Sequence, residues 1–177
     1  TYGAELYVGL APYRVDKESK DKQWRSSKQI LKQIDRNMQD PNIRGEVFYS
    51  AKQIFKNQQV QIEKRLTEKE YKYKTLSPEN GRIKRMEAES PKNLSMEIID
   101  DKYVKLRWNR GENAKRFVIY KFKKNKPKNL ENPEFIIDVT GLTEAVIPCK
   151  QSDLKKYRIG VTSLSPSHTE SAIAYFN

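Results

Sequence analysis

The first apolar run of the chain, Ala4 to Val15, is nearly continuous. Such a run is typical of a parallel strand that is covered on both faces. A second apolar run follows at residues 45–50, and between the two runs apolar side chains recur every three or four positions. Helical spacing returns over residues 59–74. The pattern therefore predicts strand, helix, strand, helix, which is the order of parallel βαβα units.

The predicted helix between the two strands begins with a capping box, Ser26 followed by Gln29, and stops at Asp40-Pro41. Its buried stripe comprises Trp24, Ile30, Leu31, Ile34 and Met38. The stripe of the second helix comprises Val60, Ile62, Leu66 and Tyr73. Trp24 is interpreted as a packing anchor.

Two parallel strands form an incomplete sheet, so residues 1–75 are interpreted as the tail of a larger α/β fold that begins upstream of Thr1. A small α+β domain that is complete in itself remains the alternative. Uncovered strand edges and an exposed apolar face invite a partner. We expect this region to pack against the second half of the chain or to pair with its counterpart in a homodimer.

The pattern changes after residues 76–90, which contain the breakers Pro78, Asn80 and Gly81 and are interpreted as a linker. From residue 91 to residue 177 short runs alternate with turn signals. Seven strands at this spacing predict an all-β, antiparallel sandwich. They are Leu94 to Ile99, Tyr103 to Trp108, Arg116 to Phe122, Phe135 to Val139, Ala145 to Ile147, Tyr157 to Ser163 and Ser171 to Phe176.

The sandwich half resembles a fibronectin type III domain. The resemblance rests on VKLRWN with Trp108, FVIYKF with Tyr120, Leu154 three residues before Tyr157, and the final SAIAYF. It implies that Leu154 and Tyr157 form a tyrosine corner, in which the hydroxyl bonds back to the chain. It also implies a spacer or interaction module, because this fold carries no chemistry by itself.

The first half, with LYVGLAPYRV, then QIDRN, then GEVFYSAKQI, resembles the last two βα units of a bacterial glycosyl hydrolase-like (β/α)8 barrel family. Members of that family are often exported or lipid-anchored, and a β-sandwich commonly follows the barrel. The resemblance therefore implies a secreted glycoside hydrolase that is extracellular, periplasmic or anchored to the outer membrane. Its expected partners are a polysaccharide or oligosaccharide and the upstream barrel portion of the same protein.

Barrel active sites gather at the carboxyl ends of the strands, and glycoside hydrolysis usually needs two carboxyl groups there. The two strand ends offer no carboxylate, so catalytic residues are expected upstream of Thr1 and this piece is expected to be inactive alone. Tyr13 is a candidate stacking ring, and Arg14, Tyr49 and Lys52 complete the candidate substrate-binding set. Ordinary loop residues are the alternative interpretation of these positions.

The chain has a formal charge of +12 among 177 residues, which raises the question of nucleic-acid binding. The excess is evenly spread, since residues 1–90 and 91–177 each carry +6. A dedicated nucleic-acid site concentrates charge, and the one dense run, residues 121–128, is interpreted as a solvated loop. One Cys and one His exclude an internal disulfide and a histidine-based metal cluster, and no cofactor is expected. No transmembrane run is present.

Two functions remain open at this stage. The chain is either the C-terminal piece of a secreted glycoside hydrolase or a non-catalytic module that binds carbohydrate or protein. An exposed row of aromatic side chains on the sandwich would favour the second.

Overall fold

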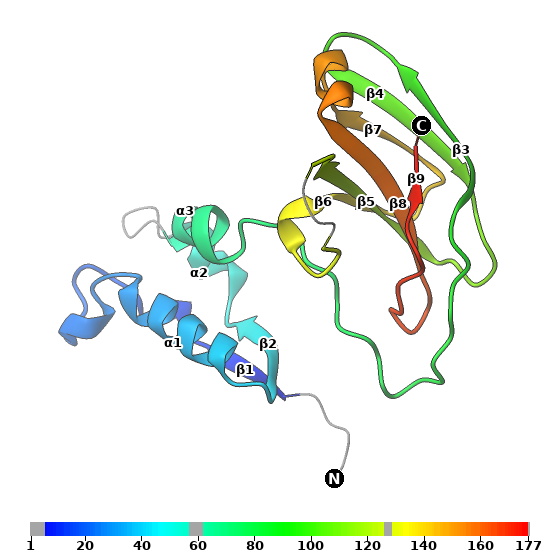
Figure 1. The fold of residues 1–177 in the computed structure, drawn as a ribbon. Coiled ribbons are helices and arrows are strands. Elements are labelled where there is room, and N and C mark those ends of the chain that lie inside the picture. Colours follow the sequence, from blue (N-terminus) through cyan, green and yellow to red (C-terminus); the bar gives the residue numbers. More distant parts are fainter. Residues whose placement is uncertain (1–5, 57–61, 126–128, 177) are drawn as a thin grey trace. The chain divides into compact units, whose positions relative to one another are not determined.

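The computed structural model describes residues 6–56, 62–125 and 129–176, and the chain divides into two compact units, Thr1–Lys72 and Tyr73–Asn177. Figure 1 shows the helices and strands of the two units.

The first unit is built on two parallel strands, β1 (Leu6–Leu10) and β2 (Ile43–Phe48). Their register places Leu10 beside Phe48. The helix α1 (Lys28–Gln39) connects them, after short 3₁₀ turns at Pro12–Arg14 and Lys22–Trp24. β2 is followed by α2 (Ala51–Lys56), α3 (Ile62–Arg65) and a π-helical turn over Leu66–Glu70. The predicted order of strand, helix, strand, helix is therefore observed.

The core of the first unit lies on one face of the β1–β2 pair. Its buried side chains are Leu10, Val15, Trp24, Ile30, Leu31, Ile34, Ile62 and Leu66, with Val8, Phe48 and Ile54 packed against them. The strand alternation turns Tyr7 and Val47 away from this core, and they are 46% and 57% exposed. The prediction that the first strand is covered on both faces is wrong for the described residues, because helices pack on one face alone.

The helix boundaries differ from the predicted ones. Helix α1 begins at Lys28, and Ser27 in the N-cap position makes no side-chain capping bond. The Ser26 hydroxyl accepts from the amide of Lys28 at 3.4 Å and not from that of Gln29, so the predicted capping box does not form among the described residues. Met38 is 67% exposed, and Asn37 is the buried residue of the last turn. The predicted second helix is not continuous: Val60 lies outside the described residues, and Tyr73 lies beyond the helical segment. Trp24 is buried in the core, as its interpretation as a packing anchor requires.

The second unit consists of two antiparallel sheets that face each other (Figure 1). One sheet contains β3 (Lys92–Ile98), β4 (Tyr103–Asn109) and β7 (Glu144–Pro148), in that order. The other contains β6 (Ile136–Thr140), β5 (Arg116–Lys123), β8 (Tyr157–Leu164) and β9 (Ala174–Tyr175). Further 3₁₀ turns cover Pro133–Phe135 and Gln151–Lys155. This arrangement is a β-sandwich, consistent with a fibronectin type III-like fold.

The sandwich core is centred on Trp108, which is 3% exposed and makes edge-to-face contacts with Phe117 and Phe176 at ring distances of 5.3 and 6.3 Å. The inward orientation predicted for Trp108 is confirmed. Strand β5 is buried on both faces, since Phe117 and Ile119 belong to this core while Val118 and Tyr120 belong to a second cluster on the opposite face. The alternation of β5 was ambiguous in the sequence for this reason.

The segment between residues 76 and 90 is packed along the sandwich. Leu76 lies against the second cluster, Ala88 belongs to the central core, and the amide of Glu89 donates to the carbonyl of Glu112 at 3.0 Å. The predicted boundaries at 75 and 91 remain predictions.

The predicted tyrosine corner is wrong. The Tyr157 hydroxyl makes no hydrogen bond to any described residue, and the ring instead lies under the Lys121 ammonium at 4.6 Å.

Candidate functional site

The carboxyl ends of β1 and β2 bring two exposed tyrosines together. The amide of Tyr49 donates to the carbonyl of Leu10 at 3.0 Å, which extends the pairing of the strands by one residue. Tyr13 follows β1 in the Pro12–Arg14 turn, where Pro12 fixes the backbone at the first position. The Tyr13 and Tyr49 rings are 6.2 Å apart and perpendicular, and 56% and 75% of the two residues are exposed.

The side chain of Arg14, the residue after Tyr13, is stacked on a buried tryptophan. Its guanidinium carbon lies 4.3 Å from the centre of the Trp24 ring, a cation–π distance, while Trp24 itself is 6% exposed. The stacked guanidinium remains exposed, and its N–H groups form no hydrogen bond with a described residue. Arg14 can therefore donate to a ligand from a fixed position.

Lys52 is exposed on α2, the helix that lies beside the Pro12–Arg14 turn. The structure brings Tyr13 and Tyr49 into direct contact and places Arg14 next in the chain to Tyr13. It puts Lys52 on the neighbouring helix, without a contact to either ring. The tryptophan under Arg14 was not predicted as a site residue, because no spacing pattern links a loop arginine to Trp24.

The carboxylates nearest to these strands have structural partners. Glu46 accepts hydrogen bonds from the Asn37 amide at 3.4 Å and from the Tyr71 hydroxyl at 2.9 Å, and burial together with Glu46 raises the pKa of Tyr71. Asp16 accepts from the backbone amide of Glu18 at 2.9 Å. Glu5 lies outside the described residues. Two exposed rings and two cations can bind a polyhydroxylated ligand, but they do not form an acid and nucleophile pair.

The described residues carry neither a metal-binding cluster nor a membrane-spanning helix. They contain no group of three or more His, Cys, Asp or Glu side chains arranged to hold a metal ion. No helix in the described part of the chain has the length and apolarity needed to cross a membrane.

No family model matches the chain, and no curated protein matches it. Among solved structures it is similar to a protein described as "FN3tt mut", with 17% identity and a TM-score of 0.38 over 50% of this chain and 90% of that one. It is also similar to a Fn3-like protein from Clostridium thermocellum, with 17% identity and a TM-score of 0.37 over 51% and 92% of the two chains.

A third similar structure is the glycoside hydrolase domain of Endo-D from Streptococcus pneumoniae R6, with 12% identity and a TM-score of 0.39. The match covers 52% of this chain and 15% of that one, so the chain spans a small part of the hydrolase's length. The assignment of the second unit as a fibronectin type III-like β-sandwich rests on the order of its strands in the two sheets.

Proposed function

We propose that this chain is a carbohydrate-binding part of a glycoside hydrolase-type protein, in which the first unit supplies the aromatic side of a saccharide site. One observation carries the proposal: Tyr13 and Tyr49 stand exposed and in contact at the carboxyl ends of two parallel strands. This is the edge at which barrels of parallel strands bind their ligands.

The chemistry of the site suits a sugar. A tyrosine ring offers a flat apolar face to the C–H groups of a pyranose while its hydroxyl remains in water. Arg14 and Lys52 carry several N–H donors each, which match the hydroxyl oxygens of a saccharide. The Arg14 guanidinium rests on Trp24, so little conformational freedom is lost when it donates.

We also propose that β1 and β2 are the last two strands of a (β/α)8 barrel. This proposal is supported by the parallel pairing and by the exposed apolar side chains Tyr7 and Val47 on the face opposite to α1. Further parallel strands of the upstream barrel portion would cover these side chains, with a homodimer as the other possible cover. The acid and nucleophile would come from those strands, and the protein would act on polysaccharide outside the cytoplasm.

The sandwich is proposed as a non-catalytic module. The outer face of the β3–β4–β7 sheet carries ion pairs of Lys105 with Glu144 and of Arg107 with Glu97, at 3.0 and 2.9 Å. Tyr103 is the exposed aromatic residue among the described positions of these three strands. A row of rings for sugar stacking is therefore absent from this described face, which favours the first unit as the saccharide site.

The test is calorimetric titration of the 177-residue chain with a panel of neutral oligosaccharides. For a saccharide that binds, Tyr13→Ala and Tyr49→Ala should each weaken binding about tenfold, because a stacking ring contributes on the order of 1.4 kcal/mol. Tyr13→Phe should bind almost as the parent, since the ring remains. The matched control is Tyr103→Ala, which removes an exposed ring from the sandwich. Binding that is lost equally in the control, or in none of the variants, would contradict the proposal.

A further inference from the structure

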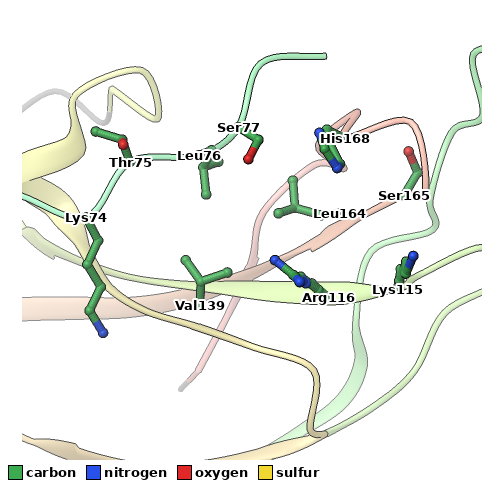
Figure 2. A pocket seen from close by; sticks show the side chains of 10 residues that line it. All are labelled: Lys74, Thr75, Leu76, Ser77, Lys115, Arg116, Val139, Leu164, Ser165 and His168. Atoms are coloured by element: carbon green, nitrogen blue, oxygen red, sulfur yellow. The ribbon is translucent and has the colours of Figure 1, made fainter. Parts of the chain in front are cut away.

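A cavity of about 620 Å³ lies in the second unit (Figure 2). One wall is the segment Lys74, Thr75, Leu76 and Ser77. The remaining lining residues are Lys115 and Arg116 at the start of β5, Val139 of β6, Leu164 at the end of β8, Ser165 directly after it, and His168. The volume lies within the usual range of small-molecule sites.

The charge of the lining is of one sign. Lys74, Lys115 and Arg116 are cationic, and none of the ten lining residues is Asp or Glu. Lys74 is neutralised by Asp138, with 2.5 Å between Nζ and Oδ1. Lys115 and Arg116 are both exposed, and their side chains form no ion pair or hydrogen bond with a described residue. Two unneutralised cations thus converge on one concave surface, which favours an anionic ligand.

The rest of the lining combines hydroxyl and apolar groups. Thr75 and Ser77 carry hydroxyls that form no hydrogen bond with a described residue, so they remain available to a ligand. Leu76, Val139 and Leu164 supply an apolar wall. A ligand that fits this lining carries an anionic group, hydroxyls and an apolar face.

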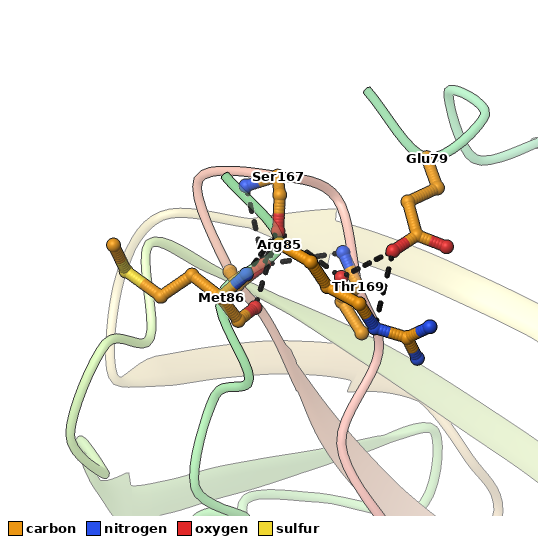
Figure 3. Close-up of polar contacts among 6 residues, drawn as sticks. Glu79, Arg85, Met86, Ser167 and Thr169 are labelled. Carbon is orange, nitrogen blue, oxygen red and sulfur yellow. Dashed lines mark hydrogen bonds and ion pairs between the residues drawn. The ribbon is translucent and has the colours of Figure 1, made fainter. Parts of the chain in front are cut away.

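The segment that follows the wall is fixed in place by the loop after β8. The His168 ring nitrogen Nδ1 donates to the carbonyl of Pro78 at 3.0 Å, and the amide of Asn80 donates to the carbonyl of Ser167 at 2.9 Å. Thr169 donates to Glu79 at 3.0 Å, as Figure 3 shows. These bonds join protein groups to one another, so the segment beside the wall is held by the chain itself and an occupant would lose little entropy in ordering it.

Farther along the same segment, Figure 3 also shows Arg85 paired with Glu79 at 3.4 Å and the amide of Met86 donating to the Ser167 hydroxyl at 3.0 Å. The wall is therefore attached to the loop by contacts that extend over residues 78–86.

We propose that this cavity binds an anionic sugar, with Lys115 and Arg116 holding the anionic group and Thr75 and Ser77 bonding to ring hydroxyls. The anionic group can be a carboxylate or a phosphate, and both present oxygens to which a guanidinium donates in a bidentate manner. The proposal does not depend on the tyrosine pair, because the cavity lies entirely in the second unit.

The experiment is a chemical-shift titration of the isotope-labelled 177-residue chain with glucuronate, glucose 6-phosphate and glucose. Glucuronate or glucose 6-phosphate should shift the amides of Ser77, Lys115 and Arg116, and the two probes distinguish a carboxylate from a phosphate ligand. Glucose, which is neutral, should bind at least tenfold more weakly. Added salt should weaken the binding of the anionic sugars, because both cations are exposed.

Arg116→Gln and Lys115→Gln should each weaken the binding of the anionic sugar about tenfold, since each removes one charge-assisted hydrogen bond donor. Lys156→Gln, which removes an exposed charge elsewhere in the same unit, should leave binding unchanged. The proposal is overturned if glucose binds as tightly as glucuronate and glucose 6-phosphate. It is also overturned if no sugar shifts these amides, or if Lys156→Gln weakens binding as much as Arg116→Gln.

Discussion

Replacement of Trp108 by alanine should remove a large share of the stability of the sandwich. A tryptophan side chain buries about 150 to 250 Å². At about 25 cal/mol per Å² its transfer from water is worth roughly 4 to 6 kcal/mol, which is an upper value because an unfolded chain already buries part of that surface. We therefore expect Trp108→Ala to cost about 3 to 5 kcal/mol.

Trp108→Phe separates ring packing from the indole N–H. The Nε1 atom of Trp108 is buried and has no hydrogen-bond partner among the described residues, so the wild type already bears the cost of desolvating that donor. Phenylalanine keeps much of the contact with Phe117 and removes the unpaired donor. Its cost should be about 1 to 2 kcal/mol, well below that of alanine.

The assay is urea unfolding of the full chain, in which the labelling of Cys149 reports the unfolding. Cys149 is the single cysteine and is buried in the sandwich core. With a slope near 2 kcal/mol per molar urea, Trp108→Ala should lower the midpoint by roughly 2 M. Tyr103→Ala, at a residue that is 43% exposed, serves as control and should change stability by less than about 0.5 kcal/mol. A urea midpoint of Trp108→Ala equal to that of the wild type would show that the Trp108 ring does not stabilise the sandwich core. An equal loss of unfolding free energy in the alanine and phenylalanine variants would contradict the role of ring packing.

Three further outcomes are expected. Gly111→Ala should destabilise the sandwich by about 1 to 3 kcal/mol, because the new Cβ would lie 2.7 Å from the Glu89 carbonyl oxygen. Gly81→Ala should be neutral, because no atom lies within 4 Å of the added Cβ, and equal urea midpoints of the two variants would contradict this. Hydrogen bonding from Lys105 lowers the pKa of Glu144, so the free energy of unfolding should fall as the pH drops from the ordinary carboxyl range through the lowered pKa. Lys105→Met should make the stability less dependent on pH in this range, as acid melts would show. Cys149 is 2% exposed and burial raises the pKa of its thiol, so a thiol reagent should label it only as fast as the sandwich opens. Immediate labelling of the native chain would be the opposite result.

The strands of the sandwich could be predicted from the sequence because one face of each is apolar. The observed β4, Tyr103–Asn109, extends the predicted strand by one residue, and its alternation puts Leu106 and Trp108 in the core. The last strand is shorter than predicted, Ala174–Tyr175, because the preceding residues 171–173 contact the sheet outside a regular ladder. Alternation does not identify a single inward face for β5 or β8, because consecutive residues of both strands are buried.

The first unit shows where the hydrophobic pattern is insufficient. A continuous apolar run indicates that a strand can be covered on both faces, but it does not indicate that the cover is present, and Tyr7 remains exposed. Met38 fits the helical spacing and yet is exposed, because Asn37 takes the buried position in the last turn and donates to Glu46 of β2. The contact between Tyr13 and Tyr49 follows from two parallel strands ending together, so this part of the candidate site could be anticipated.

The cavity of the second unit could not be predicted, because its residues come from segments far apart in the chain. Lys115 and Arg116 carry no spacing signal that relates them to Ser77 or His168. The densest basic run of the sequence lies at residues 121–128. The two unpaired cations of the cavity, Lys115 and Arg116, are adjacent residues outside that run. Charge composition thus indicates how much charge a chain carries, and the fold decides where it converges.

The saccharide site proposed at the carboxyl ends of β1 and β2 is tested most directly by a chemical-shift titration of the labelled chain with the neutral oligosaccharide that binds most tightly. We expect the amides of Tyr13, Arg14 and Tyr49 to shift together and to saturate at the same concentration, while those of the sandwich stay in place. Saturable shifts confined to the sandwich, or no shift at Tyr13 and Tyr49 with any neutral saccharide, would contradict the proposal.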